Sequence, residues 1–182
     1  MSTPMGDEHM TTEHVSTAYM GPEYIEGYRP GLLGRIAELH GIYYAKVWGS
    51  GVEFEGMMAQ ELHEFLAHYQ VGRDLLLTAH VDGRFVGSIA VAGSKTDQPG
   101  ARLRWVIVEE AYHGRGIGKE LLRRALEFCR TTGYSRVYLW TVEGLPQSLG
   151  LYLNAGFRIV DRFPDDRYSV PRVNLLLDRD LP

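Results

Sequence analysis

A glycine-rich segment between a strand-like pattern and a helical pattern constrains the fold more than any other feature of the sequence. The segment consists of His113, Gly114, Arg115, Gly116, Ile117, Gly118 and Lys119. Apolar residues alternate with others over residues 102–108 before it and recur at helical spacing over residues 117–129 after it, which predicts a strand and an amphipathic helix. Glycines allow tight turns and close approach of the backbone to a ligand, and a helix N-terminus attracts anions. The segment therefore predicts a strand–turn–helix unit whose amide groups hold a pyrophosphate.

Two well-known nucleotide-binding loops do not fit this segment. A P-loop needs a glycine where His113 stands, and a serine or threonine where Glu120 follows Lys119. A dinucleotide-binding fingerprint reads GxGxxG and opens an early βαβ unit, whereas this segment reads GxGxG and lies late in the chain. The remaining alternative to a phosphate site is a plain structural turn before a helix.

The hydrophobic period changes along the chain in a way that predicts an α/β fold. The predicted elements are helices over residues 32–43 and 54–69, strands over 74–81, 84–92 and 102–108, a helix over 117–129, a strand over 136–142, a helix over 146–154, and strands over 157–161 and 172–177. Asp82 and Gly83 between the first two strands are typical of a type I′ hairpin turn. The order ααβββαβαββ mixes strands and helices in one layered domain.

Length and charge narrow the class of protein. A chain of 182 residues fits one domain, which we place at residues 21–182, and the unpatterned residues 1–20 predict a flexible N-terminal tail. The net charge of -4 argues against nucleic-acid binding, which needs a concentrated basic surface. Neither a membrane-spanning apolar run nor an export signal is visible, and Cys129 is the only cysteine. We therefore expect a cytoplasmic protein without a membrane partner, and the histidine spacing predicts no metal site.

The glycine-rich segment and a second motif together resemble the GNAT superfamily of acyl-CoA-dependent N-acyltransferases. Residues 113–118 match the family pattern of Arg or Gln, two residues, Gly, one residue, and Gly or Ala, except that His113 stands first. Residues 151–157, which read LYLNAGF, resemble the family's LYxxxGF ending. The resemblance spans residues 28–177 and implies a mixed central sheet of six to seven strands flanked by about four helices. Around His40, Trp48 and Phe54 the chain also resembles the acetyltransferase half of proteins fused to MarR-type regulators.

The resemblance implies a chemistry and a cofactor, acetyl-coenzyme A. An N-acetyltransferase of this family passes an acetyl group from acetyl-CoA to an amine by direct attack in a ternary complex. The implied cofactor-binding residues are Val106, Ile107, Val108, His113, Gly114, Arg115, Gly116, Ile117, Gly118, Lys119 and Tyr152. Among them, the backbone N–H of Val108 is expected to stabilise the oxyanion, and the phenol of Tyr152 to protonate the departing thiolate.

Several assignments stay open in the sequence. Glu109 is a candidate general base, and Glu53, Glu55 and His40 are alternatives to it. Arg104 alternates with Val106 and Val108, which predicts that it shares their face of the strand, reaches the acceptor cleft and favours an acidic acceptor.

The partners are equally open. The acceptor is either a small-molecule amine or a protein amine. The oligomeric state is open, and the resemblance makes a homodimer one of the alternatives because dimers are common in the family. A non-catalytic acyl-CoA-binding sensor or assembly module remains the alternative to the enzyme.

Overall fold

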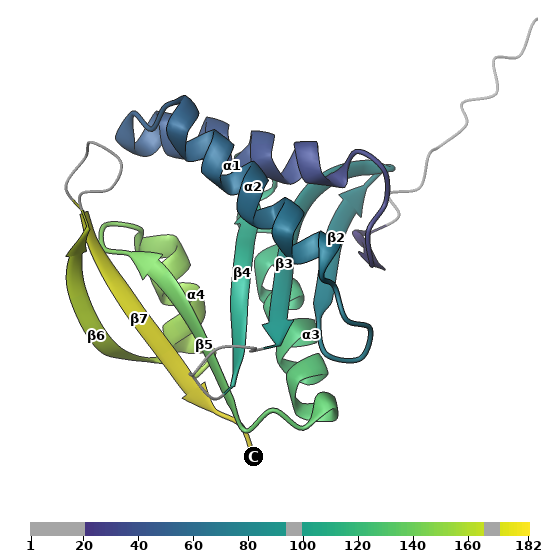
Figure 1. Ribbon diagram of the computed structural model, residues 1–182, viewed down its shortest axis with the longest axis vertical. Helices are drawn as coiled ribbons and strands as arrows, with labels where there is room; N and C mark the ends of the chain where they lie inside the picture. Colours follow the sequence, from purple (N-terminus) through teal and green to yellow (C-terminus); the bar gives the residue numbers. More distant parts are fainter. Residues whose placement is uncertain (1–20, 94–99, 166–171) are drawn as a thin grey trace, which may run out of the picture.

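The computed structural model describes residues 21–93, 100–165 and 172–182 (Figure 1). The tail predicted for residues 1–20 lies outside this range. The elements are β1 (Glu23–Glu26), α1 (Leu32–Trp48), α2 (Val52–Ala67), β2 (Leu75–Val81), β3 (Arg84–Gly93), β4 (Ala101–Val108), the 3-10 helix η1 (Glu110–Tyr112), α3 (Ile117–Thr132), β5 (Arg136–Val142), α4 (Pro146–Asn154), β6 (Arg158–Asp165) and β7 (Arg172–Asp180). The strands form one mixed sheet in the order β1-β2-β3-β4-β5-β7-β6, which confirms the predicted α/β class.

Most predicted elements are present, and the differences have simple causes. The hairpin turn is confirmed, since Asp82 has a φ of 50° and Gly83 a φ of 74°, as a type I′ turn requires. The strand β1 is not predicted by the sequence pattern. It is a four-residue edge strand that pairs antiparallel with β2, and it is too short for a period of two to be visible. The last two strands extend beyond their predicted ends, to Asp165 and Asp180.

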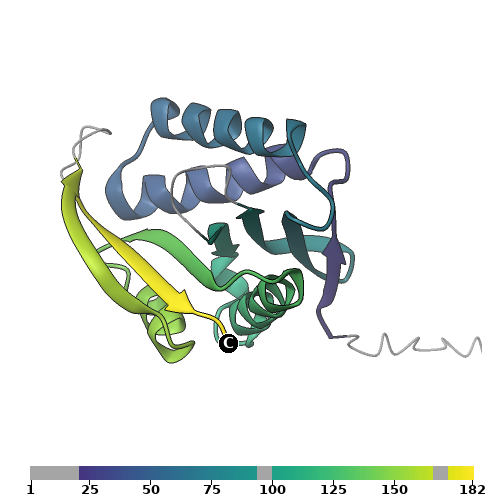
Figure 2. The same ribbon diagram turned by 60° about the horizontal axis from the view of Figure 1, so that its bottom comes forward.

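Helices cover both faces of the sheet. The helices α1 and α2 lie side by side on one face, and α3 lies on the other (Figures 1 and 2). The core on the α3 face includes Leu77, Ile89, Leu121 and Leu139, whereas the core under α1 and α2 includes Ile36, Leu62, Leu76 and Trp105. None of the helices within the described residues is long and apolar enough to span a bilayer.

The neighbouring strands β4 and β5 diverge, and this divergence opens the sheet. They run parallel and pair only from Ala101 with Val137 to Leu103 with Leu139. Beyond Leu103 the two strands separate, as Figure 1 shows. Backbone groups on that edge of β4 therefore have no strand partner along the second half of the strand.

A bulge in β4 changes which residues face which helices. The register between β3 and β4 shifts between Ser88 and Ala90, and Trp105 adopts a φ of 48°, which costs a non-glycine residue about 1–2 kcal/mol. The Ser88 hydroxyl donates a hydrogen bond to the Trp105 carbonyl over 2.8 Å, which helps to hold this conformation.

The bulge corrects the prediction for Arg104. Trp105 packs under α1 and α2, and Arg104 forms an ion pair with Glu61 of α2. Val106 and Val108 instead pack against the core on the α3 face. The prediction that Arg104 shares a face with these valines is wrong, because a bulge places two consecutive residues on the same side of a strand.

Candidate active site

The junction between β4 and α3 forms the first half of the site. Gly114 and Gly116 have φ values of 75° and 78°, and Gly116 is the N-cap of α3, without a side-chain cap. The first helical hydrogen bond runs from the Glu120 amide to the Gly116 carbonyl over 3.0 Å. The preceding amides of the first turn therefore have no partner within the helix. They border a cavity of about 560 Å³, which we call the junction cavity.

The residues of the junction cavity fit a pyrophosphate with an extended arm. A Cβ added at Gly118 would lie 3.6 Å from Val108 Cγ2 and 3.7 Å from Leu151 Cδ2, so glycine keeps the floor between β4 and α4 open. Lys119 also lines the cavity and supplies a positive charge. Together with the helix N-terminus, these features favour an anionic group.

The open edge of β4 provides the second half of the cradle. The Glu109 amide donates to Val86 on β3 over 2.8 Å, and strand residues direct their backbone groups to alternate edges. Val108 and Val106 therefore direct their N–H and C=O groups toward the gap between β4 and β5. Ile107 also lines the junction cavity, but its backbone belongs to the ladder with Ser88 of β3.

His113 and Arg115 take positions that the sequence pattern does not reveal. The His113 Nε2–H donates to the Val108 carbonyl over 2.8 Å, so this side chain ties the glycine-rich turn to the end of β4. The guanidinium of Arg115 lies 4.9 Å from the centre of the Tyr112 ring. Lys119, but not Arg115, is among the residues that border the junction cavity.

A second and larger cavity lies between the α1–α2 layer and the diverging strands. Its volume is about 740 Å³, and we call it the acceptor cavity. Its aromatic wall comes from α1 and α2, where Tyr44 stacks on Trp48 at 4.8 Å and meets Phe54 edge-on at 5.0 Å. Its charged residues are Glu61, Arg102, Arg104, Asp165 and Arg172.

The two cavities share one wall. Tyr44, Val106, Ser148 and Tyr152 border both of them. Tyr152 lies on α4, is 5% exposed and packs edge-on against Phe157. Burial raises the pKa of its phenol above the usual value of about 10, and the nearby Tyr44 raises it further. The Tyr152 hydroxyl therefore stays protonated at neutral pH.

The structure separates the four candidate bases. The Glu109 carboxylate pairs with Arg84 over 2.7 Å, and Glu109 borders neither cavity. Glu53 and Glu55 are exposed and also border neither cavity. His40 alone of the four lines the acceptor cavity. It donates from Nδ1 to the Ile36 carbonyl over 2.8 Å, and burial lowers its pKa to about 4. His40 is therefore neutral at pH 7, with Nε2 as its acceptor.

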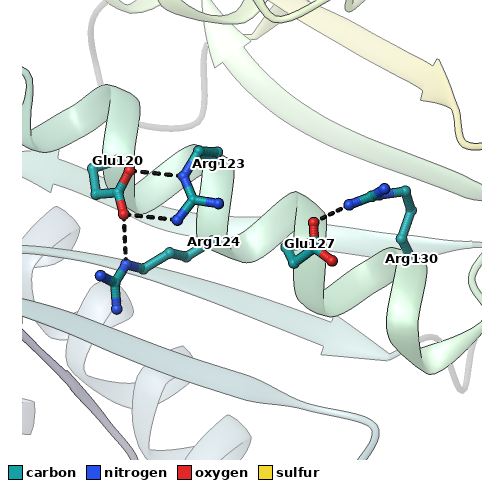
Figure 3. Close-up of polar contacts among 5 residues, drawn as sticks. All are labelled: Glu120, Arg123, Arg124, Glu127 and Arg130. Carbon is teal, nitrogen blue, oxygen red and sulfur yellow. Dashed lines mark hydrogen bonds and ion pairs between the residues drawn. The ribbon is translucent and has the colours of Figure 1, made fainter.

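The outer face of α3 carries charges that lie outside the site. Figure 3 shows Glu120 with Arg123 and Arg124, and Glu127 with Arg130. Hydrogen bonds from Arg123 and Arg124 lower the pKa of Glu120 to about 2. These arginines are held at the surface by their own helix and border neither cavity.

Several residues of the acceptor cavity are not found by sequence reasoning. Tyr44 and Trp48 continue the spacing of four residues that begins at His40, so the helical period could have indicated them. Arg172 carries no local signal, because only the fold brings β7 against Trp48 at the C-terminal end of α1. Arg102 is one position of a predicted strand, and the pattern does not say which cavity that position borders. In the parts of the chain that the structure describes, no three metal-binding side chains gather in one place.

Comparison with known proteins adds an independent finding. Residues 34–157 match the family described as "Acetyltransferase (GNAT) family". The N-acetylaspartate synthetase of Danio rerio is 37% identical over 93 residues, which are 51% of this chain and 32% of that protein. The chain thus spans about a third of the length of the curated relatives that it matches first.

Solved structures agree with the fold. An acetyltransferase of the GNAT family from Staphylococcus aureus has a TM-score of 0.70 and 19% identity, and covers 89% of this chain and 100% of its own. The PaiA N-acetyltransferase of Thermoplasma acidophilum, solved in complex with coenzyme A, has a TM-score of 0.69, 19% identity and the same coverage.

Proposed function

The chain belongs to the GNAT acetyltransferase family, and from this premise we propose that it passes the acetyl group of acetyl-CoA to an amine in the acceptor cavity. The observation that carries the proposal is the wall shared by the two cavities, formed by Tyr44, Val106, Ser148 and Tyr152. A donor held along β4 and an amine held under α1 and α2 meet at this wall. Residues 21–182 act in this proposal as one acetyltransferase unit.

The junction cavity holds the cofactor. Acetyl-CoA supplies an acyl thioester that an amine can attack. The amides of Ile117, Gly118 and Lys119 at the start of α3 bind the pyrophosphate, with the Lys119 ammonium beside them. The backbone groups of Val106 bind the extended arm as a neighbouring strand would, and the Val108 N–H lies next along the same edge, at the acyl end.

Residues of the shared wall and of the two cavities beside it carry the proton and charge steps. The Val108 N–H is directed into the gap, where it can donate to an oxygen that gains negative charge as the acyl carbon is attacked. The protonated Tyr152 phenol donates to the leaving thiolate, whose ordinary pKa is about 8.5. His40 is neutral and can accept a hydrogen bond from the incoming amine. The proton that the nitrogen loses as the amide forms replaces the one that Tyr152 gives to the thiolate.

The acceptor is an amine small enough for the acceptor cavity, whose volume of about 740 Å³ lies in the range of small-molecule sites. The relative from Danio rerio is named for N-acetylaspartate, so amino acids belong among the acceptors to be tested.

The test follows thiol release from acetyl-CoA with a panel of amines, beside calorimetry with coenzyme A. We expect saturable binding of coenzyme A and release of thiol that depends on added amine. Binding without amine-dependent release would favour the acyl-CoA-binding sensor instead. Folded protein that binds no acyl-CoA would contradict both interpretations.

A further inference from the structure

We propose that the acceptor cavity selects amines that carry a carboxylate, attracted by the guanidinium groups that line it, above all those of Arg102 on β4 and Arg172 on β7. This inference rests on the proposed function and specifies its substrate class. It starts from three guanidinium groups that line one cavity, those of Arg102, Arg104 and Arg172, against the carboxylates of Glu61 and Asp165. Arginine binds carboxylates through two parallel hydrogen bonds, which gives it geometric selectivity for this group.

The two arginines of β4 lie on the same side of the strand. They are two residues apart, and both border the acceptor cavity. The guanidinium of Arg104 is paired with Glu61 and lies 4.1 Å from the centre of the Trp105 ring. Arg104 is therefore held in place as part of the cavity wall, and Arg102 is the arginine nearer the start of β4.

Electrostatics favours an anion between these side chains. Burial and, after it, the charge of Arg102 lower the pKa of Arg104 to about 10, although the neighbouring Glu61 acts to raise it. The shift shows that the two cations interact unfavourably in a partly buried place, although both remain charged at neutral pH. A ligand carboxylate would relieve this repulsion while the amine remained free to react.

Arg172 adds a third cation to another part of the cavity wall, at the start of β7. Its guanidinium lies 5.2 Å from the centre of the Trp48 ring, and Trp48 stacks on Tyr44. The charge of Arg172 also reaches the Tyr44 phenol, since it acts to lower a pKa that burial raises to about 12. Tyr44 belongs to the shared wall, so the stacked rings of Trp48 and Tyr44 connect Arg172 to the wall at which the amine is proposed to react.

The test compares matched acceptors with matched variants. Amino acids and their carboxamides are assayed with acetyl-CoA, and rates are expressed per unprotonated amine. For the wild type we expect the acids to exceed the amides by about tenfold or more in kcat/KM. Arg102→Gln and Arg172→Gln should lose this ratio through KM, with the amides changed less than about twofold. Arg130→Gln on the outer face of α3 is the control and should retain it.

The remaining outcomes decide between the inference and the proposed function. If the wild type acetylates the carboxamides at the same rate as the acids, the inference is overturned and the proposed acetyltransferase activity stands. A preference for amines that carry a phosphate would have the same consequence. Arg102→Lys keeps the charge and serves if a glutamine variant does not fold. Should no amine react, the unfolding temperature is measured with coenzyme A and each acceptor present. We expect the acids to raise the unfolding temperature of the wild type and not that of Arg102→Lys. Equal shifts in the two proteins would contradict the inference.

Discussion

At the scale of single residues, the shared wall depends most on Tyr152. Its ring is buried against Phe157, and the residue borders both cavities. Burial keeps the phenol protonated and excludes a phenolate near neutral pH, so the proton is in place when the thiolate leaves. The residue is therefore a better candidate for the acid of the reaction than Glu109 is for the base, since Glu109 pairs with Arg84 outside both cavities.

We predict that Tyr152→Phe lowers kcat by about 10²-fold or more, the usual contribution of a general acid, while the affinity for coenzyme A stays within about twofold. The change removes only the hydroxyl and leaves the packing against Phe157. Steady-state kinetics and calorimetry measure the two quantities.

Tyr134→Phe is the matched control for that substitution. The Tyr134 hydroxyl donates to the Arg73 carbonyl over 2.9 Å, away from both cavities. Its loss should reduce the free energy of unfolding by about 0.5–1.5 kcal/mol and leave turnover unchanged. Equal turnover in Tyr152→Phe and the wild type would remove Tyr152 from the chemistry.

At the scale of elements, the two ends of α3 allow the effect of a glycine on cofactor binding to be distinguished from its effect on folding stability. Gly116 caps the start of the helix with a φ of 78°, and Gly133 caps its end with a φ of 87°. A Cβ at either glycine would have no atom within 4 Å, so alanine causes backbone strain at both ends and a clash at neither. Only the first end borders the junction cavity.

We predict that Gly116→Ala and Gly133→Ala each lower the free energy of unfolding by about 1–2 kcal/mol, the cost of a left-handed conformation for alanine. Only Gly116→Ala should also weaken coenzyme A binding, by about tenfold, because relief of the strain turns the first amides of α3 away from the anion. Urea unfolding and calorimetry on the same preparations measure both effects. Equal affinities in the two variants would show that these amides do not bind the cofactor.

At the scale of the whole molecule, a buried histidine links stability to pH. His40 of α1 is 4% exposed, and its pKa falls from 6.5 to about 4 on folding because burial disfavours its charged form. The unfolded chain therefore binds a proton between these pH values while the folded protein does not. Stability contributed by neutral His40 is complete above pH 6.5 and is lost as the pH falls toward 4.

We predict that acidification from pH 7 to pH 4 removes about 3 kcal/mol of unfolding free energy through this group. His40→Gln should flatten the dependence between pH 6.5 and pH 4, as measured by urea unfolding. His68→Gln is the matched control, because His68 makes the same bond from Nδ1 to a carbonyl four residues earlier, over 2.8 Å, but is exposed. A slope that His68→Gln removes and His40→Gln retains would refute the assignment.

The parts of the fold that were predictable are those decided by neighbouring residues. Asp82 and Gly83 predict their own turn, and the period of two on either side predicts β2 and β3. The glycine-rich segment likewise predicts the start of α3, because its glycines and the apolar stripe lie within 20 residues of one another. The resemblance to MarR-type fusions and the homodimer stay predictions.

The sequence by itself determined the elements, their order and the family motif of the junction, because periodicity and turn chemistry act over a few residues. Only the tertiary structure decided which cations face the acceptor. The bulge at Trp105 moved Arg104 to the α1–α2 side of β4, and the return of β7 placed Arg172 over Trp48, more than 100 positions away in the chain. A local pattern records which face of a strand is apolar, but register shifts and long-range pairings depend on residues far apart in the sequence.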